Sequence, residues 1–336
     1  GRTRRPVRVL ILVGAVAGSH APDVPAGRVR SGRACHMCAQ CELSLHRRQR
    51  ERYVGCVSRV TIQTPRGVSL SGTFTRPVDC RDAAVIFSHT FLSDRHASGM
   101  FDMLGRALRR AGYATLSCDF SGHGESGDEI IAFEPLIEDF RSASGWLADQ
   151  GFERQVCVGH EFGATVALRA CPPAVQTFIL VSPVLGPLSY DWSVVFSEVQ
   201  LSDLELHGTT TVPDDSQSVR RQFTISKRTL ADMSMVSAEE VLSGLDVPVL
   251  ITHDSFDSET GLLDRTRDAF HMLPDGSVVE MIAVPDSVVD GYTPPEGVPV
   301  AGEVVERALH ASDSANLPDL RDVASRWASR WVPVGR

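Results

Sequence analysis

The sequence predicts an α/β fold in which helices flank a mostly parallel, eight-stranded sheet. From Val57 onward, short runs rich in β-branched residues alternate with segments of helical length, the pattern of strands joined by crossover helices. Several runs, such as AAVIF and VPVLI, are almost continuously apolar, as parallel strands buried on both faces are. A strand, a tight turn between two glycines and a helix then follow one another at 156–164.

The elements expected in chain order cover most of the sequence after residue 53. We expect strands at 57–63, 68–73, 83–88, 113–119, 155–159, 177–181, 247–252 and 278–284. We expect helices at 98–111, 135–150, 162–170, 260–272, 302–310 and 319–331. Residues 53–186 and 246–336 would together form the α/β core.

Residues 187–245 interrupt this alternation with scattered aromatic residues and a helical stretch toward Met235. An insertion after the sixth strand lies at the carboxyl edge of such a sheet, where ligands bind. We therefore interpret 187–245 as a small cap. A surface excursion without ligand contact is the alternative.

The first 52 residues differ in charge from the rest of the chain. They hold eleven arginines and three acidic residues, so a net charge of −9 for the whole chain leaves about −17 on the remainder. An acidic body argues against a nucleic-acid partner, and no apolar run reaches the roughly 18 residues of a spanning helix. We expect residues 1–52 to be disordered. Residues 1–21 would make the protein secreted if they act as a signal peptide; otherwise we expect a cytoplasmic protein.

Cysteines offer one metal-binding pattern. Cys35, Cys38 and Cys41 form a C-x-x-C-x-x-C run that could supply thiolate ligands to zinc. A structural zinc site usually has a second regular pair, and here only a lone Cys56 follows, so we interpret the run as incidental thiols. No phosphate loop or dinucleotide fingerprint is present in the body. We predict no metal, no cofactor, a small-molecule substrate as partner, and no membrane partner, with a homodimer left open.

The turn at 159–163 is the most informative segment. Gly159 and Gly163 flank His160, Glu161 and Phe162. A sharp strand-to-helix turn forces its central residue into a strained conformation, and its glycines allow the strand and helix to pack closely. The turn follows Ser88-His89-Thr90-Phe91 by about 70 residues, and that earlier segment stands where a fold with such a turn places its oxyanion loop. The central residue, Glu161, is therefore expected at the edge of the sheet.

Between these two segments, Asp119 to Ser126 reads D-F-S-G-H-G-E-S. This resembles the D-x-x-G-H-G-x-S signature of α/β hydrolases of the esterase and serine-aminopeptidase-like group. The resemblance extends from about Val68 to Trp331 and implies an α/β-hydrolase fold, with the turn at 159–163 as a nucleophile elbow.

The resemblance also implies roles for particular residues. An oxyanion hole would be formed by backbone N–H groups of Thr90 or Phe91 and of Phe162. The acid of the triad would be Asp257, in the segment His253 to Asp257, with a departure from the family pattern at Asp254. His89, His96 and His160 are candidate pocket residues. His89, His123 and His160 also stand where this fold commonly uses histidine for packing.

Two positions depart from a serine hydrolase. Glu161 occupies the nucleophile position, and the segment 285–290, where the family places its histidine, contains none. Ester hydrolysis through an activated serine is therefore not expected. Our first hypothesis is that Glu161 is a general acid or base that acts beside the oxyanion hole in an elimination, isomerisation or cyclisation. The alternatives are a binding protein without catalytic activity and a hydrolase with a glutamate nucleophile.

Overall fold

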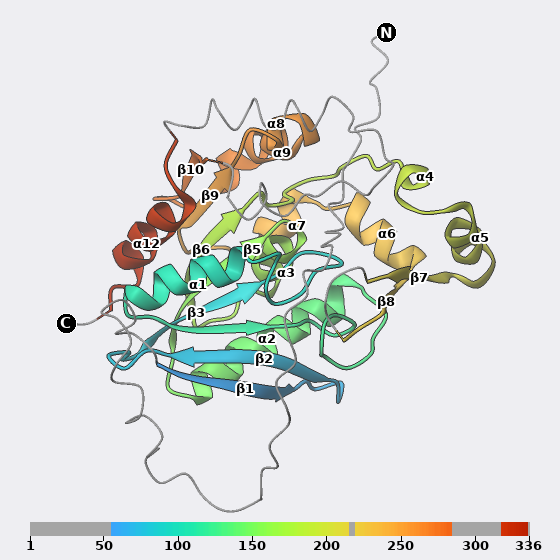
Figure 1. Cartoon of the computed structure of the whole chain (residues 1–336). Coiled ribbons are helices and arrows are strands. Elements are labelled where there is room, and N and C mark those ends of the chain that lie inside the picture. The colour runs from blue at the N-terminus through green and yellow to red at the C-terminus, as the bar shows by residue number, and fades with distance from the viewer. Residues whose placement is uncertain (1–54, 215–218, 284–316, 335–336) are drawn as a thin grey trace, which may run out of the picture.

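The computed structural model describes residues 55–214, 219–283 and 317–334 (Figure 1). Eight strands form one sheet in the order β1-β2-β4-β3-β5-β6-β9-β10, in which β2 pairs antiparallel with β1 and β4 and the other pairs are parallel. The strands are Cys56–Gln63, Ser69–Arg76, Ala83–Ser88, Ala114–Cys118, Arg154–His160, Val175–Val181, Val249–His253 and Val278–Met281. The predicted α/β fold and its eight-stranded, mostly parallel sheet are confirmed.

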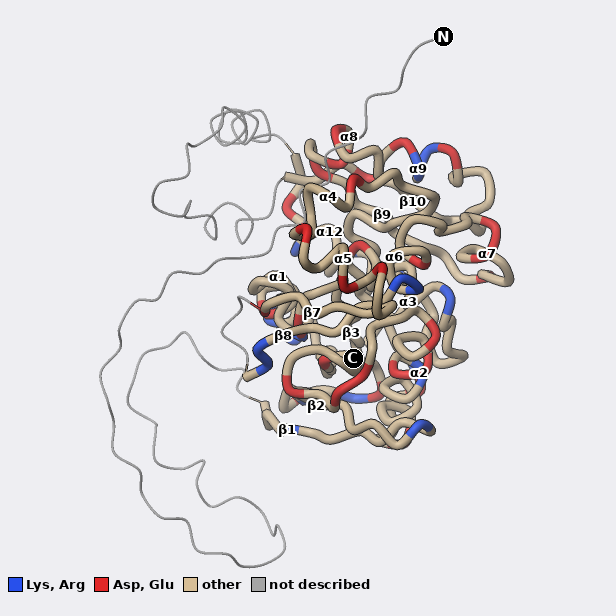
Figure 2. The backbone as a smooth tube through the Cα atoms, turned by 90° about the vertical axis from the view of Figure 1, so that its right-hand side faces the viewer, with Lys and Arg blue, Asp and Glu red and all other residues tan. Residues whose placement is uncertain are grey.

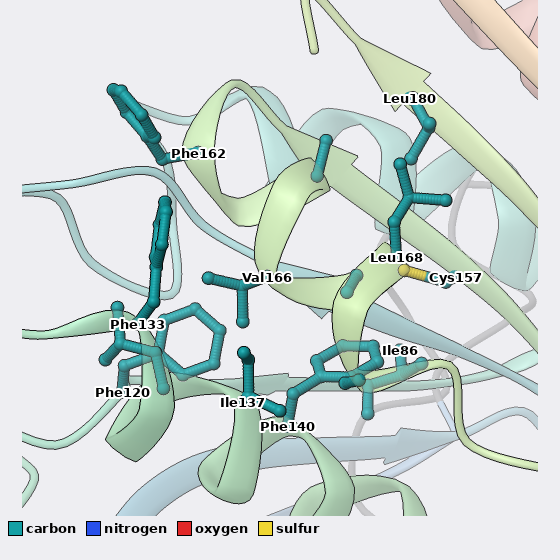
Figure 3. Close-up of a cluster of buried hydrophobic side chains, with 14 of the residues drawn as sticks. Ile86, Phe120, Phe133, Ile137, Phe140, Cys157, Phe162, Val166, Leu168 and Leu180 are labelled. Carbon is teal, nitrogen blue, oxygen red and sulfur yellow. The ribbon is translucent and has the colours of Figure 1, made fainter. Parts of the chain in front are cut away.

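Helices cover both faces of the sheet. On one face lie α1 (Met100–Arg110) and α12 (Leu320–Trp331), and on the other lie α2 (Phe133–Asp149) and α3 (Phe162–Ala170). Alternate residues of a strand point to opposite faces. In β3, Ile86 accordingly packs with the α2 and α3 core shown in Figure 3, whereas Val85 and Phe87 pack with α1 and α12.

The insertion between β6 and β9 contains four helices and a separate hairpin. The helices are α4 (Trp192–Val195), α5 (Glu198–His207), α6 (Lys227–Ser234) and α7 (Ala238–Leu242), and the hairpin strands are β7 (Thr209–Pro213) and β8 (Gln222–Ser226). The hairpin was not predicted. The insertion is attached to the core where Ile131 N donates to Thr224 O at 3.0 Å.

The segment after β9 corrects one prediction. Instead of one helix over 260–272, the chain forms α8 (Asp257–Thr260), α9 (Leu262–Ala269) and a 3₁₀ turn at Phe270–Met272. Gly261 separates α8 from α9 with a φ of 83°, a left-handed conformation that interrupts a right-handed helix.

Some predictions fall outside the described residues: the extension 1–52 with Cys35, Cys38 and Cys41, and the helix at 302–310. Within the described ranges, no helix is both long and apolar enough to cross a membrane. Figure 2 shows acidic positions spread over α5, α8, α9 and neighbouring loops, with basic positions among them.

Candidate functional site

The turn between β5 and α3 has the strained geometry expected of an elbow. Glu161 has φ 45° and ψ −116°, values that are rare for a residue with a side chain. A Cβ atom on Gly159 would lie 2.6 Å from the Cα of Ala164, and one on Gly163 would lie 2.2 Å from the carbonyl oxygen of Ser88. The two glycines therefore permit the close approach that places Glu161 at the apex of the turn.

Two neighbouring groups face the Glu161 carboxylate. The Thr90 hydroxyl donates to Oε2 at 2.9 Å, and Nε2 of His160 lies 3.9 Å from Oε1. The Glu161 side chain is 41% exposed, so it is accessible to a small molecule. The Thr90 hydroxyl is a contact that the sequence reasoning missed, since only its backbone N–H had been considered.

Backbone donors lie in the same region. Among the described residues, the N–H groups of Thr90, Phe91 and Phe162 have no hydrogen-bond acceptor, whereas the N–H of Glu161 donates to the carbonyl of Val181 at 3.0 Å. The Phe91 and Phe162 residues are both buried. Partly buried N–H groups without acceptors are suited to an oxygen atom of a ligand.

A narrow cavity adjoins these donors. Its lining is mostly apolar and comes from the core and the insertion: His89, Phe91, Ile131, Ala132, Phe133, Leu136, Phe162, Gly163, Val166, Thr229, Asp232 and Met233. Its volume is about 20 Å³, room for about one water molecule. Glu161 is not among the lining residues, so its carboxylate lies outside this cavity. A larger ligand would have to displace side chains such as that of Met233.

An aromatic row connects Glu161's neighbour Phe162 with the insertion. The ring centroids of Phe162 and Tyr190 are 6.5 Å apart, and Tyr190 stacks on Trp192 at 4.7 Å. Burial, and then the negative charge of Glu161, raise the pKa of the Tyr190 phenol. The phenol therefore stays protonated near neutral pH, close enough to Glu161 to respond to its charge. The sequence reasoning did not single out Tyr190.

Asp257 is the first residue of α8, just after β9, and its carboxylate contacts its own neighbours. Its Oδ2 accepts from the Ser182 hydroxyl at 2.8 Å and lies 2.6 Å from Nδ1 of His253, whose Nε2 contacts the Thr266 hydroxyl at 2.8 Å. No contact with Glu161 is among those of the described residues. Burial, and then the charge of Asp257, raise the pKa of the adjacent Asp254 to about 6.

The remaining histidines differ in their surroundings. His89 is buried, with Nδ1 donating to the carbonyl of Thr90 at 2.8 Å and Nε2 accepting from the N–H of Phe120 at 3.0 Å. Burial lowers the pKa of His89, and it lowers that of His123 further. His96 is exposed and pairs with Asp102 at 3.0 Å. Within the described ranges, no group of three or more His, Cys, Asp or Glu residues could hold a metal ion.

Several solved structures resemble the fold of this chain. The esterase Pf2001 of Pyrococcus furiosus has a TM-score of 0.57 at 16% identity, over 84% of this chain and 92% of that one. The esterase domain of a Rhodothermus marinus protein has a TM-score of 0.52 at 22% identity, over 83% and 100%. The α/β hydrolase GrgF from Penicillium sp. sh18 has a TM-score of 0.53 at 17% identity, over 77% and 99%. At these identities the likeness shows a shared α/β-hydrolase fold.

The sequence itself gives a narrower assignment. No curated protein sequence matches the chain. Residues 79–253, which include the loop after β3, the D-F-S-G-H-G-E-S segment and the turn at Glu161, match the family model described as serine aminopeptidase, S33. That match covers more than half of the chain. The chain therefore belongs to the serine aminopeptidase S33 family of α/β hydrolases.

Proposed function

We propose that this protein is an enzyme in which Glu161 is a general acid or base for a small carbonyl- or ester-bearing substrate. The supporting observation is the position of its carboxylate. It lies at the apex of a strained turn, accepts a hydrogen bond from Thr90 at 2.9 Å, and is next in sequence to the N–H of Phe162, which has no acceptor among the described residues.

The family's usual serine chemistry does not suit these residues. A serine hydrolase needs a hydroxyl that a histidine activates, whereas the apex residue is Glu161 and the segment 285–290 lacks histidine. A carboxylate can instead remove a proton from a carbon next to a carbonyl group. The retained backbone donors can stabilise the resulting oxyanion.

The proposed reaction begins when the carbonyl oxygen of the substrate accepts hydrogen bonds from Phe91 N–H and Phe162 N–H. Glu161 takes the proton from the α-carbon, and the electron pair of the broken C–H bond forms an enolate. The enolate can expel a β-substituent, regain the proton at another carbon, or close a ring by attacking a second carbonyl carbon of the same molecule, whose oxygen takes the displaced electron pair. Protonated Glu161 gives its proton to the leaving group, to the other carbon or to the new alkoxide, and this restores its carboxylate.

Asp257 would then support the site indirectly. Its hydrogen bonds with Ser182 and His253 join the ends of β6 and β9, beside the strand that carries Glu161. We propose that Asp257 maintains the shape of this edge of the sheet, since its Oδ2 is already occupied.

In the binding-protein alternative, a small molecule binds near Glu161 without turnover. The apolar cavity beside Phe162, about 20 Å³, would have to widen in either case, so its volume does not favour one hypothesis over the other. In the glutamate-nucleophile alternative, Glu161 would form a covalent adduct with the substrate.

The test is exchange of ligand protons with deuterium. Small ketones, lactones and thioesters are incubated with the protein in D₂O, and loss of the α-proton signal is followed by NMR. We expect exchange with the wild type and a loss of at least about 100-fold in Glu161→Gln, the lower range for a positioned base. Glu134→Gln, which changes a side chain that is 68% exposed, is the matched control.

Other outcomes identify the alternatives. Exchange that Glu161→Gln retains would contradict the proposal. Ligands that raise the melting temperature without any exchange would favour a binding protein. Ester hydrolysis with a covalent adduct on Glu161, detected by mass spectrometry of the intact protein, would favour the nucleophile alternative.

A further inference from the structure

We infer that His160 is a positioning residue for Glu161, with its Nε2–H as a second donor to the carboxylate. Thr90 donates to Oε2, and His160 would donate to Oε1. Each oxygen of the carboxylate would then have its own hydrogen-bond donor. The inference deepens the proposed function and rests on it for its catalytic meaning, but the contact itself can be tested without a substrate.

The distance permits this contact after a small rotation. Nε2 of His160 and Oε1 of Glu161 are 3.9 Å apart, which is longer than a hydrogen bond. The terminal torsion of a glutamate side chain is soft, and the Glu161 side chain is half-exposed. Because Oε2 is fixed by the Thr90 hydroxyl at 2.9 Å, the remaining freedom is rotation that moves Oε1 toward or away from His160.

The surroundings of the two ring nitrogens together select the tautomer. Nδ1 of His160 is buried and has no hydrogen-bond partner among the described residues, so a proton there would gain no acceptor. Nε2 faces the carboxylate of Glu161, where a proton makes a donor to a charged oxygen and a bare nitrogen would set one lone pair against another. In the neutral ring the proton is therefore on Nε2. The imidazole is a donor to the carboxylate in this state.

Two other histidines provide internal references. His89 donates from Nδ1 to the Thr90 carbonyl and accepts at Nε2, so its neutral ring has the opposite tautomer. His96 directs Nδ1 toward Asp102 at 3.0 Å. Among these three rings, only that of His160 directs Nε2 toward a carboxylate.

The experiment is ¹⁵N NMR of the histidine rings in the full chain at pH 8, where an ordinary imidazole is neutral. A spectrum of His160→Gln identifies the His160 signals. We expect a protonated Nε2 and a bare Nδ1 for His160, and the reverse for His89. In Glu161→Gln we expect the His160 Nε2 signal to move while the signals of His89 and His96 stay in place.

A proton on Nδ1 of His160 in the wild-type spectrum would overturn the inference, and this result does not depend on the folding of any variant. Signals of His160 that ignore Glu161→Gln would also overturn it, with Glu161→Ala as the second variant. The proposed function fails separately, if Glu161→Gln keeps deuterium exchange while the NMR result holds.

The catalytic consequence has its own readout. Gln places an amide N–H close to where the Nε2–H of histidine lies, and leucine has no donor. We expect His160→Leu to lower kcat for exchange about 10-fold with little change in KM, and His160→Gln to restore most of it. Equal losses in both variants would show that the ring only fills space.

Discussion

The hydroxyl of Thr90 donates to Oε2 of Glu161 across 2.9 Å, which joins the loop after β3 to the turn between β5 and α3. The Thr90 side chain therefore fixes the orientation of the carboxylate. Its backbone N–H is also a candidate donor of the oxyanion hole, so one residue contacts both parts of the proposed machinery.

Thr90→Val keeps the shape of the side chain and removes its donor. A hydrogen bond to a charged group contributes about 1.5–3 kcal/mol, so we expect roughly a 10-fold or greater loss in kcat for deuterium exchange. Thr90→Ser keeps the hydroxyl and should stay close to the wild type. An unchanged rate in Thr90→Val would show that the carboxylate needs no such orientation.

Gly163→Ala should destabilise the protein strongly. The added Cβ would lie 2.2 Å from the carbonyl oxygen of Ser88 and 2.3 Å from that of His89, and both are backbone atoms that cannot move without shifting β3. We expect a loss of about 2–4 kcal/mol in the free energy of unfolding, in the upper range for single substitutions, measured by urea titration.

Gly145→Ala is the matched control for that substitution. Gly145 lies inside α2, and a Cβ there would meet nothing within 4 Å. Alanine is favoured over glycine in a helix by about 1 kcal/mol, so this variant should be more stable than the wild type. If both alanine variants changed the stability equally, the close packing at Gly163 would not be the cause.

Much of the fold could be predicted from the sequence because its signals are local. The strand at 83–88 was predicted with the bounds of β3, since a buried parallel strand is marked by its own continuous apolar residues. The turn around Glu161 was predicted from the spacing of two glycines within one short segment, although the close approach that requires Gly163 is to Ser88 and His89. The break at Gly261 was not, because a single glycine in a helical pattern is often tolerated.

The contacts of the candidate site were harder to predict because they depend on three-dimensional packing. The hairpin of β7 and β8 was missed, since a two-stranded unit derives its stability from the surface it covers. The engagement of Asp257 by Ser182 and His253 joins two strands that are distant in sequence. No spacing pattern shows which of two nearby carboxylates, Asp254 or Asp257, has free oxygen atoms.

Mild acid should destabilise the protein through His123. Its ring is buried, Nε2 has no partner among the described residues, and it contacts the ring of Phe223 in the insertion at 5.4 Å. Burial, and then the charge of His89, hold the pKa of His123 well below 6.5. Below pH 6.5 the histidine of the unfolded chain binds a proton, whereas the buried ring of His123 stays neutral. The stability that the neutral ring contributes is therefore present above pH 6.5 and is lost as the pH falls below it.

We therefore expect His123→Asn to reduce the loss of unfolding free energy between pH 6.5 and pH 5, by up to about 1.4 kcal/mol per pH unit. His96→Asn is the opposite control. The hydrogen bond with Asp102 raises the pKa of His96, so the stability from that pair is present below pH 6.5 and is lost as the pH rises. A pH slope that His123→Asn leaves unchanged would assign the acid sensitivity to other groups.

Asp254→Asn should stabilise the protein at neutral and basic pH. Burial, and then the charge of Asp257, raise the pKa of Asp254 to about 6, so the folded state binds a proton more readily than the unfolded chain between about pH 4 and pH 6. Stability therefore falls as the pH rises through this window and stays lower above it.

Asparagine removes the charge and keeps an oxygen that can accept the N–H of Phe256, now bound by Asp254 Oδ1 at 2.8 Å. We expect a gain of about 1–3 kcal/mol at pH 8 that disappears near pH 4, measured by urea unfolding at both pH values. A loss of stability at pH 8 would mean that the charge of Asp254 is paired in the folded protein.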